Sequence, residues 1–354
     1  MTSHFQFNQP FRLESGVTLP GYHLAYTTHG KLNAARNNVV WIFHALTANA
    51  NPLEWWPGLV GEGKFLDPQQ YFIICVNKPG SPYGSISPLS VNSETGSPWY
   101  HNFPLFTIRD MIRMYQQLRR ELGIQSIHVG LGGSTGGMQL LEWAIEEPEL
   151  FENIVPIVTN AALSPWGIAF NASQRMAIES DSTWLEPRPD AGQKGLAAAR
   201  SIALLSYRHY NGYDLTQARD KAFVPLHNNT VFAADNYQRY QGLKLVNRFN
   251  VISYYRLTQS MDSHDVGRDR GGLIAALSRI TARSLVIGID SDLLYPIQEQ
   301  KFLHDHIRNS EFLNVASDFG HDGFLLEYDR IEKALRTFLK PHEGYGFGGW
   351  LKKA

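Results

Sequence analysis

The sequence has little cysteine and almost no net charge. Of its 354 residues only one is cysteine, which excludes an intramolecular disulfide framework and any zinc or iron–sulfur site built on several cysteines. The 32 Lys and Arg residues nearly balance the 33 Asp and Glu residues, so the formal net charge is −1. A neutral chain lacks the basic footprint of a nucleic-acid-binding protein. We therefore expect no nucleic-acid partner, and we expect Cys75, in the apolar run 71–76, to be buried.

Long hydrophobic runs are also missing. No stretch of 18 apolar residues occurs, and residues 1–16 lack the basic and apolar segments of a signal peptide. The hydrophobic content of 43% and the aromatic content of 12% are too high for a disordered chain. We therefore expect a soluble, cytoplasmic, globular protein with no membrane partner.

Six short apolar runs, rich in β-branched and aromatic residues, alternate with helical patterns. The runs are 39–44, 71–76, 127–131, 154–158, 284–289 and 312–315. Between the second and third runs, residues 107–122 repeat apolar side chains near a period of 3.6, and Gly123 follows as a stop signal. Strand–helix alternation with continuous apolar runs predicts an α/β fold with a mostly parallel sheet that is covered on both faces.

The alternation stops between residues 163 and 277. This part of the chain is helical in pattern, for example at 170–178, 196–205 and 231–245, and contains no strand-like run. We predict three segments: the first part of a core at 1–162, a helical lid at 163–277 over the carboxyl edge of the sheet, and the second part of the core at 278–354. The glycine-rich stretch 344–349 is typical of a loose tail.

A G-x-S-x-G motif, Gly132 to Gly136, lies between a predicted strand and a predicted helix. This is the context of a nucleophile elbow, in which a sharp turn presents the serine oxygen and glycines allow the backbones to approach. We predict Ser134 as a nucleophile and the N–H of Thr135 as an oxyanion donor. The alternative is an ordinary glycine-rich turn.

In this arrangement the acid and the base follow the serine along the chain. Asp290 and Asp292 both follow the run 284–289, and we favour Asp292 because it lies further into the loop. His321 lies in a glycine-flanked loop after the last predicted strand, where it could accept the serine proton. The second oxyanion donor is expected from the loop after the first central strand, and the Leu46 N–H is our candidate.

Such a triad supports ester hydrolysis and acyl transfer equally well. The serine is acylated first, and then water or another hydroxyl group attacks the acyl-enzyme. The residues of the triad do not decide between these two acceptors.

A wider set of motifs narrows the choice. The motifs are His44-Ala45-Leu46-Thr47, Trp55-Trp56-Pro57-Gly58-Leu59, Gly132 to Ala144, Arg175-Met176-Ala177-Ile178, Arg248-Phe249, His264-Asp265-Val266-Gly267-Arg268, Ser291-Asp292 and Gly320-His321-Asp322-Gly323. In these motifs the chain resembles the homoserine O-acyltransferase family of the α/β-hydrolase fold, from about residue 5 to 340. The resemblance implies ping-pong transfer of an acyl group from acetyl-CoA, through Ser134, to the hydroxyl of L-homoserine in methionine biosynthesis. It implies small-molecule substrates, no metal, no bound cofactor and a homodimer formed through the lid.

The resemblance also implies how a zwitterionic amino acid would be held. Arg175 matches the family arginine that binds the carboxylate, and Asp322 matches the acid that meets the amino group. Thr47 and Tyr255 are weaker candidates for polar lining of the pocket. A surface position for Arg175 and a helix-capping role for Asp322 are the structural alternatives.

Some residues depart from the family pattern. Lys78-Pro79 stands where an apolar pair is common, and Ala48 stands where a glycine often follows the threonine. These departures leave the triad intact but keep other readings open: a succinyl donor, a serine acceptor, or hydrolysis of a small ester. A succinyl donor would need a cation in the acyl pocket, and the sequence alone does not place one.

Overall fold

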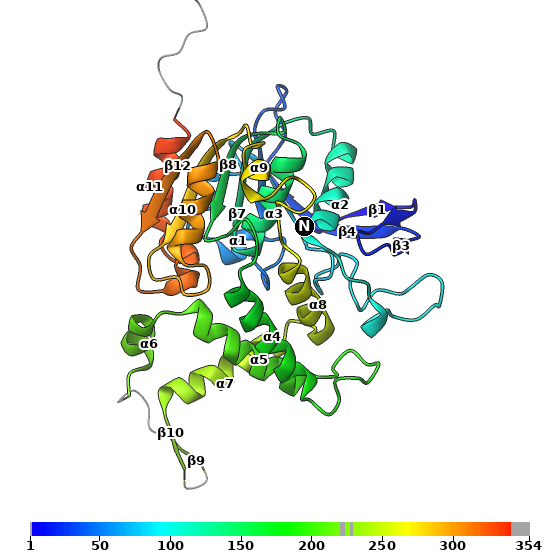
Figure 1. The fold of residues 1–354 in the computed structure, drawn as a ribbon, viewed down its shortest axis with the longest axis vertical. Helices are drawn as coiled ribbons and strands as arrows, with labels where there is room; N and C mark the ends of the chain where they lie inside the picture. Colours follow the sequence, from blue (N-terminus) through cyan, green and yellow to red (C-terminus); the bar gives the residue numbers. More distant parts are fainter. Residues whose placement is uncertain (1, 220–223, 227–228, 341–354) are drawn as a thin grey trace, which may run out of the picture.

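The computed structural model describes residues 2–219, 224–226 and 229–340, so the predicted tail at 344–349 lies outside the described residues. Its centre is an eight-stranded sheet (Figure 1). In spatial order the strands are β1 (Thr2–Phe7), β4 (Tyr22–His29), β6 (Phe72–Val76), β5 (Val39–Phe43), β7 (Ile127–Gly133), β8 (Phe151–Ile157), β11 (Arg283–Ile289) and β12 (Ser310–Val315). The six strands from β6 to β12 pair in parallel, which confirms the predicted α/β class.

Two antiparallel strands at one edge were not predicted from the sequence. β1 pairs with β4, and β4 pairs with β6, both in antiparallel fashion. A further short pair joins β2 (Phe11–Arg12) to β3 (Thr18–Leu19). β1 is half exposed and alternates in burial along its length, as expected for an edge strand with one solvated face.

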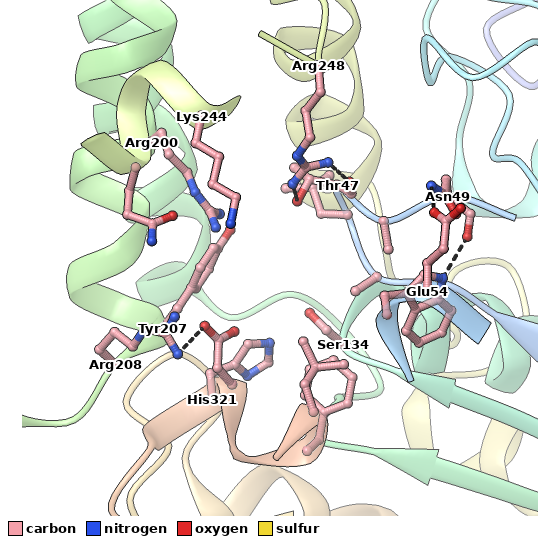
Figure 2. A pocket seen from close by; sticks show the side chains of 18 residues that line it. Thr47, Asn49, Glu54, Ser134, Arg200, Tyr207, Arg208, Lys244, Arg248 and His321 are labelled. Carbon is pink, nitrogen blue, oxygen red and sulfur yellow. Dashed lines mark hydrogen bonds and ion pairs between the residues drawn. The ribbon is translucent and has the colours of Figure 1, made fainter. Parts of the chain in front are cut away.

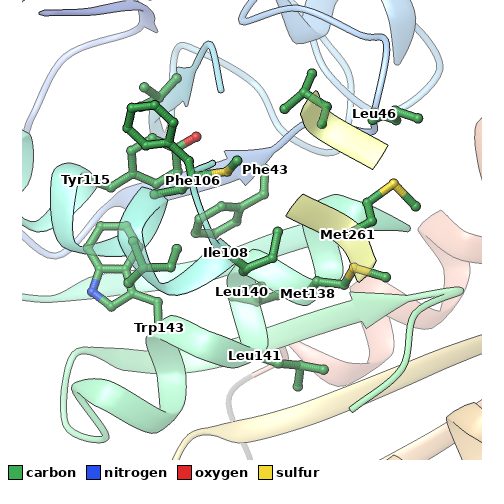
Figure 3. Close-up of a cluster of buried hydrophobic side chains, with 14 of the residues drawn as sticks. Phe43, Leu46, Phe106, Ile108, Tyr115, Met138, Leu140, Leu141, Trp143 and Met261 are labelled. Carbon is green, nitrogen blue, oxygen red and sulfur yellow. The ribbon is translucent and has the colours of Figure 1, made fainter. Parts of the chain in front are cut away.

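The sheet is covered on both faces, as its continuous apolar runs predict. Along β5, Trp41 and Phe43 point into one hydrophobic cluster, of which Figure 3 shows Phe43 and Trp143. In this cluster the Trp41 ring meets the Trp143 ring edge-on at 4.9 Å between centroids. Val40 and Ile42 point into the cluster on the opposite face. Cys75 lies in that second cluster and is fully buried, which confirms its predicted place in the core.

The core helices are α1 (Pro52–Trp55), α2 (Ile108–Glu121), α3 (Thr135–Glu146), α9 (Leu273–Leu277), α10 (Ile297–His306) and α11 (Tyr328–Phe338). α2 begins where the sequence pattern predicts, because Thr107 and Asp110 form a reciprocal capping box around its first turn. α3 follows β7 directly, so its N-terminus lies at the carboxyl edge of the sheet.

Helices α4 to α8 stand beyond the sheet in the lower part of Figure 1; we call them the lid helices. They are α4 (Pro165–Glu179), α5 (Gln193–Tyr207), α6 (Tyr210–Gln217), α7 (Ala233–Val246) and α8 (Val251–Asp262). The expectation of a strand-free insertion is wrong in one place, since β9 (Val224–Leu226) and β10 (Asn229–Val231) form a short hairpin there. α9, inside the range predicted for the lid, contacts α3 and α10 of the core.

Candidate active site

The turn between β7 and α3 holds Ser134 in a strained backbone conformation. Its φ of 58° and ψ of −126° lie outside the regions that residues with a side chain usually adopt. The two flanking glycines make the turn possible. A Cβ on Gly132 would lie 2.3 Å from the carbonyl oxygen of Gly136, and one on Gly136 would lie 2.1 Å from that of Phe43. The strand, the sharp turn and the helix together form a nucleophile elbow.

Asp292 and His321 form a buried hydrogen-bonded pair. The Nδ1 of His321 lies 2.7 Å from Oδ2 of Asp292, and the two side chains are 4% and 0% exposed. The other oxygen, Oδ1, accepts hydrogen bonds from the backbone amides of Leu294 at 2.8 Å and Tyr295 at 3.0 Å. Burial by itself lowers the pKa of His321, but the charge of Asp292 and its hydrogen bond outweigh burial and raise the pKa above its usual value.

The structure places Asp292, and not Asp290, beside the imidazole. Asp290 directly follows β11, is exposed, and accepts a hydrogen bond from the backbone amide of Ser317 at 3.1 Å. The loop after the strand brings Asp292 next to His321, and its carboxylate bonds to the ring nitrogen Nδ1.

Ser134 and His321 line one cavity of about 500 Å³ between the sheet edge and the lid helices, and they point toward one another on its floor (Figure 2). The core contributes Ala45, Leu46, Thr47, Ala48, Asn49, Glu54, Trp55, Asp322, Phe324 and Leu325 to the wall. The lid helices and the segments that follow them contribute Arg200, Tyr207, Arg208, Gln241, Lys244 and Arg248. The lid helices and the segments that follow them thus border the cavity at the carboxyl edge of the sheet and contribute six of its eighteen lining residues.

Two backbone amides are available beside the nucleophile. Thr135 begins α3, and the first amide of a helix has no acceptor inside the helix. Leu46 lies in the loop after β5 and lines the cavity. Within the described residues, neither amide donates to another backbone carbonyl or side chain. Both predicted oxyanion donors are thus unengaged in this structure.

The cavity wall is rich in cations. Arg208 pairs with Asp322 at 2.8 Å, and Arg248 donates to the carbonyl oxygen of Thr47. Arg200 lies over the Tyr207 ring at 5.4 Å from its centroid. Among the described residues, no carboxylate pairs with Arg200, which leaves its charge available to an anionic ligand.

Arg175 does not reach this cavity, so the expectation that it binds a substrate carboxylate there is corrected. It lies on α4, where its guanidinium pairs with Asp262 of α8 at 2.6 Å and donates to Thr258 at 3.2 Å. Its charge is neutralised between two lid helices. Tyr255, the weaker candidate, also lies outside the cavity wall and donates its hydroxyl to Glu179 at 2.6 Å.

Sequence reasoning missed the cations that do line the cavity, Arg200, Lys244 and Arg248. Arg200 and Lys244 occur within helical patterns that gave no sign of which face would meet the core. Arg248-Phe249 is part of a sequence motif and lies two residues after the end of α7, a position that could have indicated a turn toward the site. Asp322 and Thr47, by contrast, line the cavity as expected.

Metal sites and membrane-spanning helices are two further features that such a chain could contain. In the described part of the chain, no group of three or more His, Cys, Asp or Glu side chains could hold a metal ion. No helix in residues 2–340, as far as the structure describes them, is long and apolar enough to cross a membrane.

Comparisons with known proteins agree with this geometry. The α/β-hydrolase fold family matches residues 38–328. The homoserine O-acetyltransferase of Cyclobacterium marinum is 46% identical over 345 residues, which cover 96% of this chain and 95% of that protein. The chain belongs to the homoserine O-acetyltransferase family. Its assignment to this family makes it an enzyme of the O-acyltransferase type.

The fold of this chain is similar to solved structures of both transferases and esterases. The crystal structure of homoserine O-acetyltransferase from Bacillus anthracis has a TM-score of 0.88 at 25% identity, covering 96% of this chain and 98% of that one. The acetyl esterase MekB has a TM-score of 0.83 at 25% identity, covering 96% of each chain. The same architecture is thus found in proteins named for acyl transfer and in one named for ester hydrolysis.

Proposed function

We propose that this enzyme transfers an acetyl group from acetyl-CoA to the hydroxyl of L-homoserine, through an acyl-enzyme on Ser134, as a step of methionine biosynthesis. One observation carries the proposal. A single cavity is lined by Ser134 and by His321 with Asp292 bonded behind it, and also by Arg200 and by Asp322, whose carboxylate pairs with Arg208. An ester hydrolase needs the first set of groups, whereas a transferase to an amino acid needs both.

In the first half-reaction, His321 accepts the proton of the Ser134 hydroxyl while the serine oxygen attacks the thioester carbonyl. Asp292 holds the imidazole in the tautomer with its proton on Nδ1, because Oδ2 accepts that proton. The amides of Leu46 and Thr135 stabilise the negative charge on the carbonyl oxygen. The thiolate of coenzyme A then leaves with the proton from the imidazolium.

In the second half-reaction, the homoserine hydroxyl gives its proton to His321 and attacks the acyl group on Ser134. The amino acid carries a carboxylate and an ammonium group. Among the described residues, Arg200, Lys244 and Arg248 line the cavity without a carboxylate partner. Of these, Arg200 lies over the Tyr207 ring, whose centroid is 5.8 Å from that of the His321 ring, so we assign Arg200 the substrate carboxylate in place of Arg175. Asp322 directly follows the catalytic histidine and lines the same wall, which suits it to the ammonium group.

The cavity wall also carries positive charges that suit the coenzyme A part of the acyl donor. Coenzyme A carries several phosphate groups, and Lys244 and Arg248 are exposed cations on the cavity wall. Thr47 holds Arg248 there through its carbonyl oxygen and, at 3.4 Å, its hydroxyl. We assign these two cations to the phosphates of the donor and Thr47 to positioning Arg248.

Release of free thiol from acetyl-CoA and from succinyl-CoA, each with homoserine, with serine or with no acceptor, tests the proposal. Release that requires acetyl-CoA and homoserine together supports it. The enzyme's own thiol does not interfere, because Cys75 is fully buried and burial raises its pKa to about 12. Release with succinyl-CoA or with serine would replace the donor or the acceptor in the proposal.

Hydrolysis of a small ester is the second candidate, favoured by the likeness to the acetyl esterase MekB. Thiol release from acetyl-CoA at the same rate with and without homoserine would select it. A homoserine-dependent rate would reject it, since water would then be excluded from the second step.

We also propose a homodimer formed through the lid helices. Large apolar side chains are exposed on them, among them Met176 of α4 at 67%, Leu205 of α5 at 57% and Leu243 of α7 at 59%. Light scattering at several concentrations measures the mass directly. A monomer of the 40.0 kDa chain at all concentrations would reject the dimer.

A further inference from the structure

Lys78 places an amino group in the interior of the core, where burial lowers its pKa to about 7. It follows β6 and is 1% exposed. In the described part of the chain no carboxylate pairs with it. A buried ammonium without a counter-charge is costly unless hydrogen bonds compensate. The hydrogen bonds of Lys78 therefore indicate its role in the structure.

All the polar contacts of the Lys78 ammonium are with the loop that follows β5. Nζ donates to the carbonyl oxygen of His44, lies 3.3 Å from the carbonyl oxygen of Ala45, and lies 3.2 Å from Nδ1 of the His44 ring. The backbone amide of Lys78 donates to Nε2 of the same ring at 3.1 Å. Lys78 thus contacts the carbonyl oxygens of His44 and Ala45 through its side chain and the His44 ring through its backbone amide.

The ring of His44 has a defined proton position. Since Nε2 accepts the Lys78 amide, the ring proton resides on Nδ1, which lies 2.8 Å from the carbonyl oxygen of Ala45. Burial and the neighbouring lysine both lower the pKa of His44, so the ring stays neutral. The Ala45 carbonyl oxygen therefore accepts from the His44 ring and from Lys78, and also from the Ala48 amide at 3.2 Å.

The carbonyl of Ala45 and the amide of Leu46 belong to one peptide unit. In a planar trans peptide the C=O and the N–H point in opposite directions, so fixing the carbonyl oxygen also fixes the direction of the N–H. A hydrogen bond donated to the carbonyl oxygen further polarises the unit and strengthens the N–H as a donor. The Lys78 contacts therefore act on the amide that our mechanism places in the oxyanion hole.

We propose that Lys78, together with His44, is a positioning residue of the oxyanion hole: it holds the Ala45–Leu46 peptide so that the Leu46 N–H faces the acyl carbonyl bound at Ser134. The proposal rests on the proposed function, because it assumes acyl transfer through Ser134. It adds to the mechanism a residue that orients an oxyanion donor, a role that neither the triad nor the substrate-binding residues fill.

The other oxyanion donor is held in the same manner. The Thr135 N–H shares a peptide unit with the carbonyl of Ser134, and that oxygen accepts from the Thr159 hydroxyl at 2.9 Å and from the Gly137 amide at 2.9 Å. Both donor peptides are thus fixed from their carbonyl ends. At Thr135 the helix backbone also orients the peptide, whereas the Leu46 peptide lies in a loop and is held by the Lys78 amino group and the His44 ring.

Substitution of Lys78 by Met, which keeps the length and removes the charge and the donors, tests the proposal. Loss of an entire oxyanion donor lowers kcat by roughly 10²–10³-fold. Because the His44 ring and the Ala48 amide still hold the carbonyl, we expect about a tenfold loss. Both half-reactions use the same oxyanion hole, so acylation by p-nitrophenyl acetate and deacylation by homoserine should slow by the same factor, with KM for each unchanged.

Two further variants make the result specific. Lys78→Gln keeps a neutral donor and should give rates between those of the wild type and Lys78→Met. Lys301→Met makes the same chemical change at an exposed position of α10 and should match the wild type. Thermal unfolding of each variant shows separately whether the fold is retained.

The outcomes distinguish this proposal from the proposed function. If the wild type forms no acyl-enzyme on Ser134, the proposed function fails. If the wild type is acylated and a folded Lys78→Met has wild-type rates, or slows one half-reaction only, or raises KM alone, the positioning role is overturned. If neither Lys78 variant folds, the residue serves stability and the positioning role is likewise rejected.

Discussion

Replacement of Asp292 by Asn gives the sharpest test of the catalytic assignment. In the wild type, Oδ1 accepts two backbone amides at 2.8 and 3.0 Å, while Oδ2 accepts the Nδ1 proton of His321 at 2.7 Å. Asparagine has only one oxygen. If that oxygen stays with the two amides, the NH₂ group faces Nδ1, which must then give up its proton and accept. The proton moves to Nε2, and the imidazole loses the lone pair that receives the serine proton.

The expected loss of kcat in Asp292→Asn is large, because the His321 imidazole keeps its position but holds its proton on the wrong nitrogen. The serine-protease template loses roughly 10⁴-fold in kcat on the equivalent change, which corresponds to about 5 kcal/mol of transition-state stabilisation. We expect a loss of this order in single-turnover acylation of Ser134. Binding of the donor should change little, since Asp292 is fully buried beneath the histidine and contributes nothing to the cavity wall.

Asp290→Asn is the matched control, since it makes the same chemical change two residues earlier. Asp290 is exposed, and among the contacts described its side chain bonds only to the Ser317 amide. Its rate should stay within about twofold of the wild type, as for a surface substitution. A wild-type rate for Asp292→Asn, or an equal loss in both variants, would refute the reasoning about the tautomer.

Further predictions concern the same cavity and the elbow. Activity should fall as the pH drops through the pKa of His321, which the Asp292 carboxylate raises above 6.5 despite burial; a pH–rate profile whose acid limb lies below 6.5 would contradict this. Ser134→Ala should retain no covalent acetyl group in mass spectra of the intact protein after incubation with acetyl-CoA. Arg200→Met should lower kcat/KM for homoserine by roughly 10–100-fold and leave acylation unchanged, whereas Arg175→Met should lower the melting temperature with little effect on KM; the reverse pattern in steady-state kinetics would restore Arg175 to the substrate. Gly136→Ala should cost about 1–3 kcal/mol in the free energy of unfolding, measured in urea, because its Cβ would meet a backbone oxygen at 2.1 Å.

The parts of the molecule that depend on local chain geometry could be predicted from the sequence. The parallel strands show continuous apolar runs, and Ser134, Asp292 and His321 each follow such a run, so the carboxyl edge of one sheet collects them. The turn at Ser134 also has a signature in the sequence, because neither flanking glycine leaves room for a Cβ: Gly132 faces the carbonyl oxygen of Gly136, and Gly136 faces that of Phe43 at the end of β5. The edge strand β1 was missed, although Phe5 and Phe7 alternate with polar residues as an antiparallel strand requires.

The parts that depend on how the lid helices pack could not be predicted. Arg175 and Arg200 are both arginines on amphipathic helices, and nothing local distinguishes the one that meets Asp262 from the one that meets the cavity. The role of Lys78 was hidden for a similar reason. In sequence it is a departure from an apolar position, and only the fold brings it against the loop of His44 and Ala45.

The division of the cavity wall between core and lid separates reactivity from choice of acceptor. Ser134, His321 and the loop of Leu46 come from the core, whereas Arg200 and Lys244 come from helices that are inserted between two strands of the sheet. In the proposed mechanism, a substitution at Arg200 would therefore change how the acceptor's carboxylate is held without disturbing the groups that form and break the ester bond, whereas Asp322, the proposed partner of the ammonium group, belongs to the core.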